Sequence, residues 1–445
     1  PGLTHRPRKI LLFVNPFGGK KKGLKIWEKD VQPLMTIAGI ETKMLVTERV
    51  NHIRDILLST DLTDFHAVVC IGGDGTLAEV INGLVLRTSR DRQIDPNNPE
   101  ANLPTPRLPI GVIPSGSTDT VAYSLHGTTD VQTAAIHIIF GDSAGLDISS
   151  VHNDHTLLRL YASMLSYGYL GDVIRDSEKF RWMGPQRYDY SGKYKLYLFE
   201  RNWGKLKFQR RKFICKVNNI SSYLSVLKVY FFPVLIYILF YYCQNFTSIQ
   251  KEIKIFAKEL KKLQRKKNNK IHNIDLNSGF KKILGNKGYE GEIQLLSDPC
   301  HPATSTSNII SGWMTVRGKF FMVNGANLAC GCARSPMGFS PHCHIGDGCV
   351  DVILVRHTSL FNNIRMLLRL SSKQKTLYDL PFVEVYRARE FTFRALPTMH
   401  MHSDREINNR YMSSNLSVWN CDGEVIDNSN VKIRVHCQLV NIFTR

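Results

Sequence analysis

The sequence predicts an α/β fold in which a doubly wound α/β domain, residues 8–145, precedes a mainly antiparallel, β-rich domain. Two observations predict it. In the first part, short apolar runs alternate with helical stretches, and several runs end in loops rich in glycine and hydroxyl groups. After Gly145, strand-like runs follow one another with a single helix among them, which is typical of antiparallel sheets.

The first predicted strand, residues 9–14, ends in a glycine turn that begins Asn15-Pro16-Phe17-Gly18-Gly19. This turn is not a P-loop, because it lacks the Gly-Lys-Ser/Thr ending. Its N–H groups and the start of the next predicted helix, residues 24–37, are suited to an anion. By itself, however, a solvated basic turn is the commoner explanation.

A second predicted strand, residues 42–46, leads into Thr47-Glu48-Arg49-Val50-Asn51 and a helix that ends at Ser59. The third strand, residues 67–71, is apolar throughout, as expected of a strand buried on both faces.

The turn Gly72-Gly73-Asp74-Gly75-Thr76 follows the third strand directly. Its glycines allow a tight turn and a close approach to a ligand, which a Cβ would obstruct. A carboxylate at the carboxyl end of a buried strand lies where α/β sheets hold their sites. We expect Thr76 to cap the next helix, residues 77–86, which carries Glu79. The alternative is a turn in which Asp74 merely caps a helix.

Two further elements complete the first domain: a proline-rich surface loop, residues 88–106, and a buried strand, residues 108–113. This strand ends in Pro114-Ser115-Gly116-Ser117-Thr118-Asp119, a second glycine–hydroxyl turn that opens a helix. Because the carboxyl ends of parallel strands meet at one edge of a sheet, we expect these turns to form one site.

The second domain is predicted from strand-like runs with little helix between them. These runs cover residues 146–151, 157–167, 320–323, 350–356, 383–386, 391–394 and 431–439, and the intervening helix covers residues 360–370. We assign residues 146–192 and 280–445 to this domain.

The chain is strongly basic, with 58 Lys and Arg against 38 Asp and Glu and a net charge of +20. This charge suits nucleotide phosphates or an anionic membrane surface. We expect no nucleic-acid partner, since no nucleic-acid-binding signature occurs. Ten scattered cysteines indicate reduced thiols in the cytosol, and the Cys and His residues between positions 330 and 349 match no zinc pattern. The chain opens with Pro1 and has no signal peptide, so we expect it to be a fragment that lacks an N-terminal region.

Residues 193–279 differ in composition from the rest of the chain. Residues 229–242 are almost wholly apolar, and residues 251–270 are crowded with lysine. One interpretation is a membrane anchor with a polybasic arm, but the apolar core is shorter than the roughly 20 residues that a spanning helix needs. We favour a poorly packed insert translated from a retained intron, because AT-rich codons encode these amino acids. A mature transcript that carries the whole segment would refute this hypothesis.

The turn around Asp74 resembles one shared by phosphofructokinases, NAD kinases and the diacylglycerol, sphingosine and ceramide kinases. With residues 193–279 removed, the chain from about Arg8 onward is similar to the ceramide kinases. An ordered set of motifs carries this resemblance: Asp176-Ser177-Glu178-Lys179-Phe180-Arg181-Trp182, Arg187-Tyr188-Asp189-Tyr190-Ser191-Gly192, Tyr289-Glu290-Gly291, Arg334-Ser335-Pro336, His344-Ile345-Gly346-Asp347-Gly348, Trp419-Asn420-Cys421-Asp422-Gly423-Glu424 and Val435-His436-Cys437-Gln438-Leu439-Val440. The resemblance implies that the second domain is a β-sandwich and that the nucleotide lies in the cleft between the two domains.

The resemblance also implies ATP-binding positions spread over the whole chain. They are Asn15, Pro16, Phe17, Thr47, Glu48, Arg49, Val50, Asn51, Glu79, Gly116, Ser117, Thr118, Arg181, Arg187, Asp422, Gly423 and Glu424. Glycine turns offer N–H groups, and arginines offer charge to phosphate oxygens. A solvated basic face explains Arg181 and Arg187 as simply, and an ordinary loop acid explains Glu424.

Asp74 matches the family's catalytic base. A primary alcohol is too weak an acid to attack ATP unaided, so a carboxylate takes its proton while Mg²⁺ neutralises the phosphate oxygens. The resemblance places substrate contacts at Gly72, Gly73, Asp74, Gly75 and Asp172. The metal ligands stay unassigned, because Asp347 and Asp351 are as readily structural acids as metal ligands.

The implied activity is phosphorylation of the primary hydroxyl of ceramide to ceramide 1-phosphate, by a cytoplasmic enzyme that contacts anionic membranes peripherally. Ile174 stands where sphingosine kinases carry a second acid, which argues against sphingosine. Diacylglycerol or another sphingoid lipid is the rival acceptor, and an inactive, ceramide kinase-like lipid-binding protein is the rival of another class. The chain departs from the family in lacking a pleckstrin-homology domain and, after Cys300, the Cys-x-x-x-Cys-x-x-Cys element.

Overall fold

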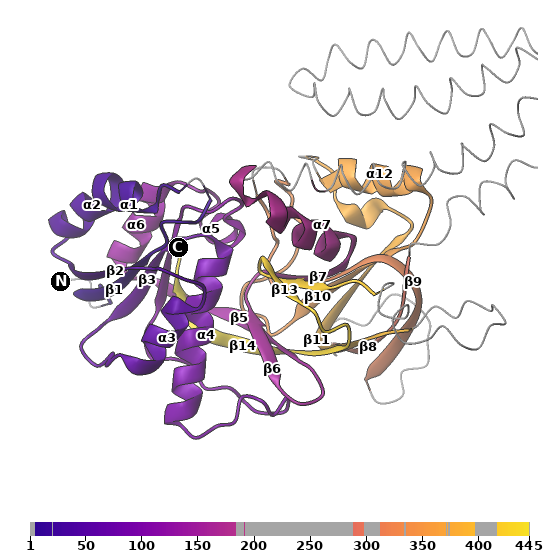
Figure 1. The fold of residues 1–445 in the computed structure, drawn as a ribbon, viewed down its shortest axis with the longest axis horizontal. Helices are drawn as coiled ribbons and strands as arrows, with labels where there is room; N and C mark the ends of the chain where they lie inside the picture. Colours follow the sequence, from indigo (N-terminus) through magenta and orange to yellow (C-terminus); the bar gives the residue numbers. More distant parts are fainter. Residues whose placement is uncertain are drawn as a thin grey trace, which may run out of the picture. The chain divides into compact units, whose positions relative to one another are not determined.

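The computed structural model describes residues 5–19, 21–183, 191, 288–297, 312–332, 335–370, 372, 374–396 and 416–444. Residues 1–195 and 286–445 belong to one compact unit, whose helices and strands are coloured along the sequence in Figure 1. The predicted insert, residues 193–279, lies outside the described residues.

Four parallel strands form the sheet of the N-terminal part, in the order β2-β1-β3-β4. They are β1 (Lys9–Val14), β2 (Glu41–Val46), β3 (Ala67–Gly72) and β4 (Ile110–Pro114). β3 and β4 are buried along their whole length, as strands covered on both faces must be. The chain goes outward from β1 to β2 and returns to the other side of β1, so the topological switch point lies between β1 and β3.

Helices cover both faces of this sheet (Figure 1). One layer consists of α1 (Gly23–Ile26), a π-helical segment (Trp27–Val31), α2 (Gln32–Ile37) and α6 (Val131–Phe140). The other layer contains α3 (His52–Ser59), α4 (Asp74–Asp91) and α5 (Thr120–His126). In β1, Ile10 and Leu12 belong to the hydrophobic core beneath the layer with α2 and α6, whereas Leu11 and Phe13 belong to the core beneath the layer with α3, α4 and α5. This alternation follows from the two-residue period of a strand.

The remaining strands pair almost entirely antiparallel. They are β5 (Ser143–His152), β6 (Leu157–Tyr161), β7 (Met164–Gly168), β8 (Tyr289–Ser297), β9 (Trp313–Ala326), β10 (Val350–Arg356), β11 (Val383–Ala395), β12 (Trp419–Cys421), β13 (Glu424–Ile426) and β14 (Val431–Phe443). Their core is rich in buried aromatic side chains, including Tyr161, Tyr167 and Trp419. The predicted α/β fold class, with a strand-rich second part consistent with a β-sandwich, is confirmed.

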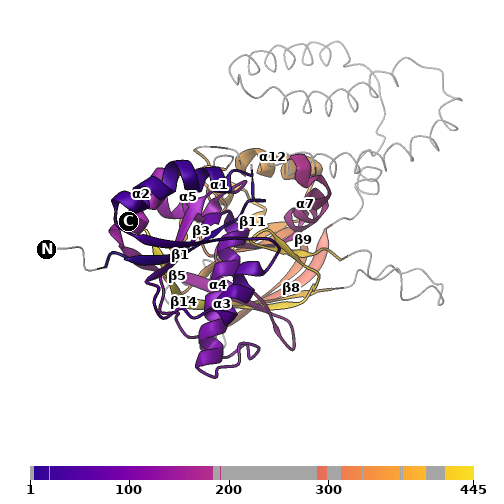
Figure 2. The ribbon, with the colours of Figure 1, turned by 60° about the vertical axis from the view of Figure 1, so that its left-hand side comes forward.

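The described residues of the strand-rich part include two helices, α7 (Tyr169–Ser177) and α12 (Leu360–Leu370). Short 3₁₀ segments lie at Glu178–Met183 and Leu377–Asp379. In both ribbon views α7 and α12 lie near one another at the upper side of the molecule (Figures 1 and 2). Among the described residues, no helix combines the length and the apolar character needed to cross a membrane.

Strand β14 joins the two parts of the unit. It pairs antiparallel with β5 and β11, and near its end Ile442 pairs in parallel with Ile110 of β4. The predicted domain boundary near residue 145 falls within β5, and the division into two domains stays a prediction.

Some predicted boundaries are wrong. Helix α4 begins at Asp74 and not at residue 77, so Thr76 lies within the first turn and makes no cap. It also runs on to Asp91, so residues 88–91 of the predicted surface loop are helical. The predicted strand over residues 157–167 is two strands, β6 and β7, whereas the runs at 383–386 and 391–394 are one strand, β11.

Candidate active site

The glycine turns after β1, β3 and β4 meet at the carboxyl edge of the parallel sheet. A Cβ added to Gly116 would lie 2.5 Å from the Cα atom of Gly73, and one added to Gly19 would lie 2.5 Å from the Ser115 carbonyl oxygen. Only glycine permits such close approach of two backbones. The structure therefore brings the three predicted turns together.

Asp74 begins α4, and the turn after β4 holds its carboxylate. Oδ2 accepts hydrogen bonds from Thr118 Oγ1 at 3.1 Å and from the Thr120 N–H at 3.0 Å, and Oδ1 accepts one from the Val121 N–H at 2.9 Å. Asp74 therefore caps helix α5, whereas the alternative interpretation of the turn expected it to cap the helix that follows the turn, α4. A carboxylate offers about four acceptor sites, so these bonds to described residues leave a site on Oδ1 for a further donor.

Asn15 shapes the first turn and ties it to α4. Its Oδ1 accepts hydrogen bonds from the Phe17 N–H at 2.9 Å and the Gly18 N–H at 3.1 Å, while its Nδ2 donates to Thr76 Oγ1 at 2.9 Å. Pro16 lies between these residues, and the Phe17 side chain is 65% exposed. The first turn is thus fixed two residues from Asp74.

Asp119 is a second carboxyl group at this edge, and sequence reasoning did not assign it a role. Its backbone is left-handed, with a φ of 51°. Its Oδ1 accepts a hydrogen bond from the Gly116 N–H at 2.8 Å. Burial, together with the negative charge of Asp74, raises the pKa of Asp119 to about 7. Its position directly after Gly116-Ser117-Thr118 was the only signal in the sequence.

Glu79, one turn further along α4, binds the loop before α3. Its Oε1 accepts the Asn51 N–H at 3.0 Å, and its Oε2 accepts the Ile53 N–H at 3.3 Å. Burial raises the pKa of the Glu79 carboxyl, and the two N–H groups act against this rise. Two predicted positions, Asn51 and Glu79, are therefore in direct contact.

The other predicted positions of this loop differ in exposure. Thr47 is buried, and its N–H donates to the Val14 carbonyl oxygen at 2.9 Å. Glu48 bonds through its N–H to His52 Nδ1 at 3.1 Å, whereas Arg49 pairs with Asp55 at 2.7 Å on the surface. The Val50 side chain is 60% exposed.

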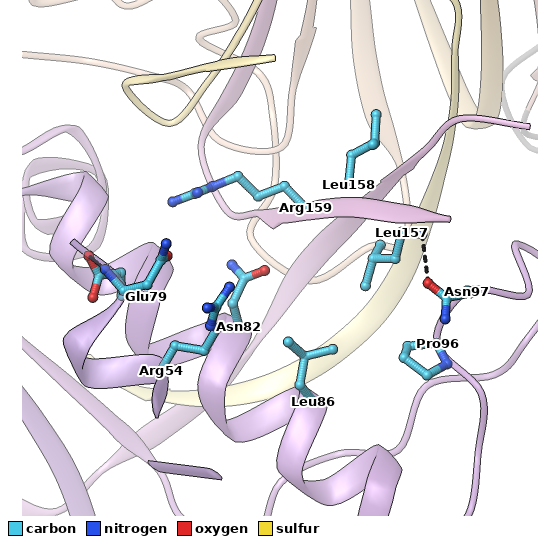
Figure 3. Close-up of a pocket in the computed structure, with 10 residues that line it drawn as sticks. Arg54, Glu79, Asn82, Leu86, Pro96, Asn97, Leu157, Leu158 and Arg159 are labelled. Atoms are coloured by element: carbon cyan, nitrogen blue, oxygen red, sulfur yellow. Dashed lines mark hydrogen bonds between the residues drawn. The ribbon is translucent and has the colours of Figure 1, made fainter. Parts of the chain in front are cut away.

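A cleft of about 300 Å³ opens beside Glu79. Figure 3 shows its walls: α4 carries Glu79 and Asn82, α3 carries Arg54, and β6 carries Leu157 and Arg159. One end of the cleft is charged and the other is apolar, so it suits a ligand with both kinds of surface. Arg159 was missed from the sequence, although a charge within an apolar strand pattern marked it.

The β12–β13 hairpin carries Asp422, Gly423 and Glu424. Asp422 is 6% exposed. Its carboxylate accepts hydrogen bonds from the N–H groups of Ala162 at 2.8 Å, Ser163 at 3.1 Å and Met164 at 3.0 Å. Burial raises the pKa of this carboxyl. Asp422 thus fixes the hairpin to the β6–β7 turn.

The hairpin reaches both the Asp74 turn and the cleft. A Cβ added to Gly75 would lie 3.8 Å from the Asp422 carbonyl oxygen. Glu424 forms an ion pair with Arg159 on the wall of the cleft. Gly423 occupies the tip with a φ of 95°, a conformation that favours glycine.

Asp172 lies in a different set of contacts, at α7. Its Oδ1 accepts a hydrogen bond from Ser417 Oγ at 2.9 Å and pairs with Arg175 Nη2 at 3.1 Å, while its Oδ2 accepts one from the Tyr289 hydroxyl. The residue is 7% exposed. Asp172 therefore connects α7 to β8 and to the start of the β12 segment, and its predicted substrate role stays a prediction.

The structure does not test the two arginines predicted to contact phosphate. Arg181 lies in the 3₁₀ segment Glu178–Met183, but its side chain is outside the described part of the chain, as is the whole of Arg187. Asp347 pairs with Arg387, and the buried Asp351 accepts a hydrogen bond from Ser340, which fits structural acids. In the described residues, no group of three or more His, Cys, Asp or Glu side chains could hold a metal ion.

Two family models match the chain: the diacylglycerol kinase catalytic domain over residues 9–151 and the ceramide kinase C-terminal domain over residues 290–445. A solved structure of a diacylglycerol kinase from Bacillus anthracis covers 99% of this chain and 97% of its own, with a TM-score of 0.51 and 12% identity. This likeness supports the fold. The fold and the two matching domains together define a lipid kinase.

Comparison with individual proteins shows which family of lipid kinases the chain resembles. Ceramide kinase of Homo sapiens is 36% identical over 461 residues, covering 100% of this chain and 74% of the human protein, and that of Mus musculus is 36% identical over 457 residues, covering 100% and 75%. The ceramide kinase-like protein of Homo sapiens is 25% identical over 472 residues, covering 99% and 70%. The chain belongs to the ceramide kinase family.

Proposed function

We propose that this protein transfers the γ-phosphoryl group of ATP to the primary hydroxyl of ceramide and forms ceramide 1-phosphate. Membership of the ceramide kinase family supports this acceptor. The observation that carries the proposal is the position of Asp74, at the junction of the glycine turns and at the start of α4. Backbone N–H groups at helix N-termini are suited to phosphate oxygens.

Asp74 is proposed as the general base. Its contacts with Thr118, Thr120 and Val121 fix the carboxylate in one orientation. The remaining acceptor site on Oδ1 is available for the O–H of the lipid. Its proton passes to the carboxylate as the new P–O bond forms and the bond from the γ-phosphorus to the bridging oxygen breaks, releasing ADP.

The nucleotide is proposed to lie beside the turns at Asn15 and Gly116, the loop from Thr47 to Asn51, Glu79 and the hairpin Asp422-Gly423-Glu424, with Arg181 and Arg187 completing the site. Mg²⁺ usually keeps several waters and contacts proteins through one or two carboxylates together with substrate phosphates. Such an ion would neutralise phosphate charge when bound, and its protein ligands stay unassigned.

We also propose a substrate-contacting role for Gly72 to Gly75 and for Asp172, and peripheral contact with anionic membranes. Ile174 supports a neutral amide acceptor, because no carboxylate stands there to pair with the amine of a sphingoid base. Diacylglycerol is the rival that the site itself does not discriminate.

A lipid panel with labelled ATP tests the proposal. The full chain and a variant lacking residues 193–279 are assayed with ceramide, diacylglycerol and sphingosine, beside Asp74→Asn. We expect ceramide to be the best acceptor and Asp74→Asn to lose about 10²-fold or more in turnover, which is typical of removing a general base. Turnover preserved in Asp74→Asn contradicts the role of Asp74, and a better rate with another lipid contradicts the acceptor.

A further inference from the structure

Arg159 connects two acidic side chains of the candidate nucleotide site. Its Nη1 forms an ion pair with Glu424 Oε2. Its positive charge also acts on the Glu79 carboxyl, on which the negative charge of Glu424 acts in the opposite direction. These residues come from β6, β13 and α4, and Figure 3 shows Arg159 extending from β6 toward the end of the cleft that Glu79 lines.

The guanidinium has unused hydrogen-bonding capacity. Its Nε and Nη2 atoms are buried and have no hydrogen-bond partner in the described part of the chain. Buried polar atoms of this kind call for an explanation, because most such atoms in proteins are paired. The Arg159 side chain is 12% exposed and lines the cleft, so water held in the cleft beside a bound ligand is a natural partner of these two nitrogens.

The charges of the cleft call for a cation as well. Glu79 and Glu424 are two acids, and the proposed ligand is itself an anion. Without a positive group between them, both carboxylates repel the phosphates of a nucleotide. Arg159 lies where it offsets this repulsion.

We propose that Arg159 is a positioning residue for the nucleotide, which holds Glu424 on the β12–β13 hairpin against the cleft and compensates the charges of Glu424 and Glu79. This inference rests on the proposed nucleotide site, and it adds a residue that none of the sequence motifs contains. Arg159 acts through Glu424, so the two side chains form one unit in nucleotide binding.

The test measures nucleotide affinity separately from phosphoryl transfer, on the full chain. The Kd for ADP is determined by calorimetry, and the KM for ATP and kcat are determined with saturating ceramide. For Arg159→Met we expect the Kd and KM to rise about tenfold or more, the size expected for losing a charged hydrogen-bond partner, with kcat within about twofold. Arg159→Lys, which keeps the charge, restores part of the affinity.

A matched control removes an ion pair elsewhere in the same unit. Arg356 pairs with Glu384 at 2.7 Å between β10 and β11, and both side chains are about one-third exposed. Arg356→Met is expected to lower the melting temperature but leave the Kd for ADP unchanged. Glu424→Gln, combined with Arg159→Met, is expected to weaken ADP binding no further than the Arg159 substitution alone.

Wild-type affinity for ADP in Arg159→Met overturns the proposal, as does a loss confined to kcat. Additive effects of the Arg159 and Glu424 substitutions contradict action through Glu424. If Arg159→Met does not fold, the Kd for ADP of Arg159→Lys and of Glu424→Gln tests the proposal instead, and wild-type affinity in both variants overturns it. A wild-type protein that binds ADP but does not phosphorylate ceramide contradicts the proposed acceptor and leaves the measurement on Arg159 valid.

Discussion

Asp74 and Asp119 are carboxyl groups that the turn before α5 brings close enough to influence each other. Asp74 receives N–H and hydroxyl donors from this turn, whereas Asp119 accepts the Gly116 N–H. Burial beside the negative charge of Asp74 disfavours the ionised form of Asp119. At the scale of residues, the fold therefore gives two neighbouring acids different environments.

Asp119 makes stability depend on pH. Its pKa is raised from an ordinary 3.8 to about 7 by burial and by Asp74, so between these pH values the folded protein binds more protons than the unfolded chain. The contribution of Asp119 to the free energy of unfolding therefore falls as pH rises from about 4 to about 7. In Asp119→Asn this contribution is absent, while the amide oxygen still accepts the Gly116 N–H.

We expect the stability of Asp119→Asn relative to wild type to increase between pH 4.5 and 7 and then to level off. Urea unfolding at half-unit steps of pH measures this difference, and titrating groups common to both proteins cancel. A stability difference that stays constant over this pH range contradicts the raised pKa of Asp119.

At the scale of elements, the Asp422 carboxylate binds the β12–β13 hairpin to the β6–β7 turn, in addition to the pairing of β12 with β7. Asp422 accepts the N–H groups of Ala162, Ser163 and Met164 and the Ser163 hydroxyl. The hairpin in turn carries Glu424 to Arg159 and brings its backbone beside Gly75. A structural bond thus sets the position of a candidate binding element.

Replacing Asp422 is expected to loosen this hairpin. In Asp422→Ala several buried N–H groups lose their acceptor, and each unsatisfied donor costs about 1–3 kcal/mol, so we expect a loss of roughly 3 kcal/mol or more in the free energy of unfolding. Asp422→Asn, which keeps one oxygen, loses less.

The exposed Asp154, in the β5–β6 hairpin, provides the control. Asp154→Ala is expected to change stability by no more than about 0.5 kcal/mol. Denaturant unfolding compares the three variants, and an Asp422→Ala protein as stable as Asp154→Ala shows that the N–H groups find other partners.

At the scale of the whole molecule, the net charge of +20 is a long-range property. We expect such a charge to attract the chain to anionic surfaces, over about 10 Å at 0.1 M salt but only about 3 Å at 1 M. A lipid kinase benefits from this attraction because its acceptor resides in a bilayer.

Vesicle co-sedimentation measures this attraction. We expect the full chain to bind vesicles that contain phosphatidylserine, to bind pure phosphatidylcholine vesicles weakly, and to be released from the anionic vesicles as salt rises to 1 M. The variant lacking residues 193–279 shows whether the lysine-rich segment supplies the binding. Equal binding to both vesicle types at all salt concentrations contradicts an electrostatic contact.

The parts of the fold that could be predicted are those with a local signal. The apolar runs of β1, β3 and β4, each followed by glycine, defined the parallel sheet and its edge. Helix ends were less certain: Thr76 follows a glycine turn, as a cap does, yet in the structure its hydroxyl is bound by Asn15 from the turn after β1. The bond that decides its role comes from a turn distant in sequence, which no local pattern reveals.

The sequence by itself determined the fold class, the glycine turns and the family, because short, contiguous motifs indicate each of these. Only the tertiary structure showed that Asp74 caps α5, that Asp119 lies beside it, and that Arg159 links Glu424 to the cleft beside Glu79. Each of these relations joins residues from different strands and helices. Charge and burial at such a junction depend on packing in space, and the linear order of residues does not specify that packing.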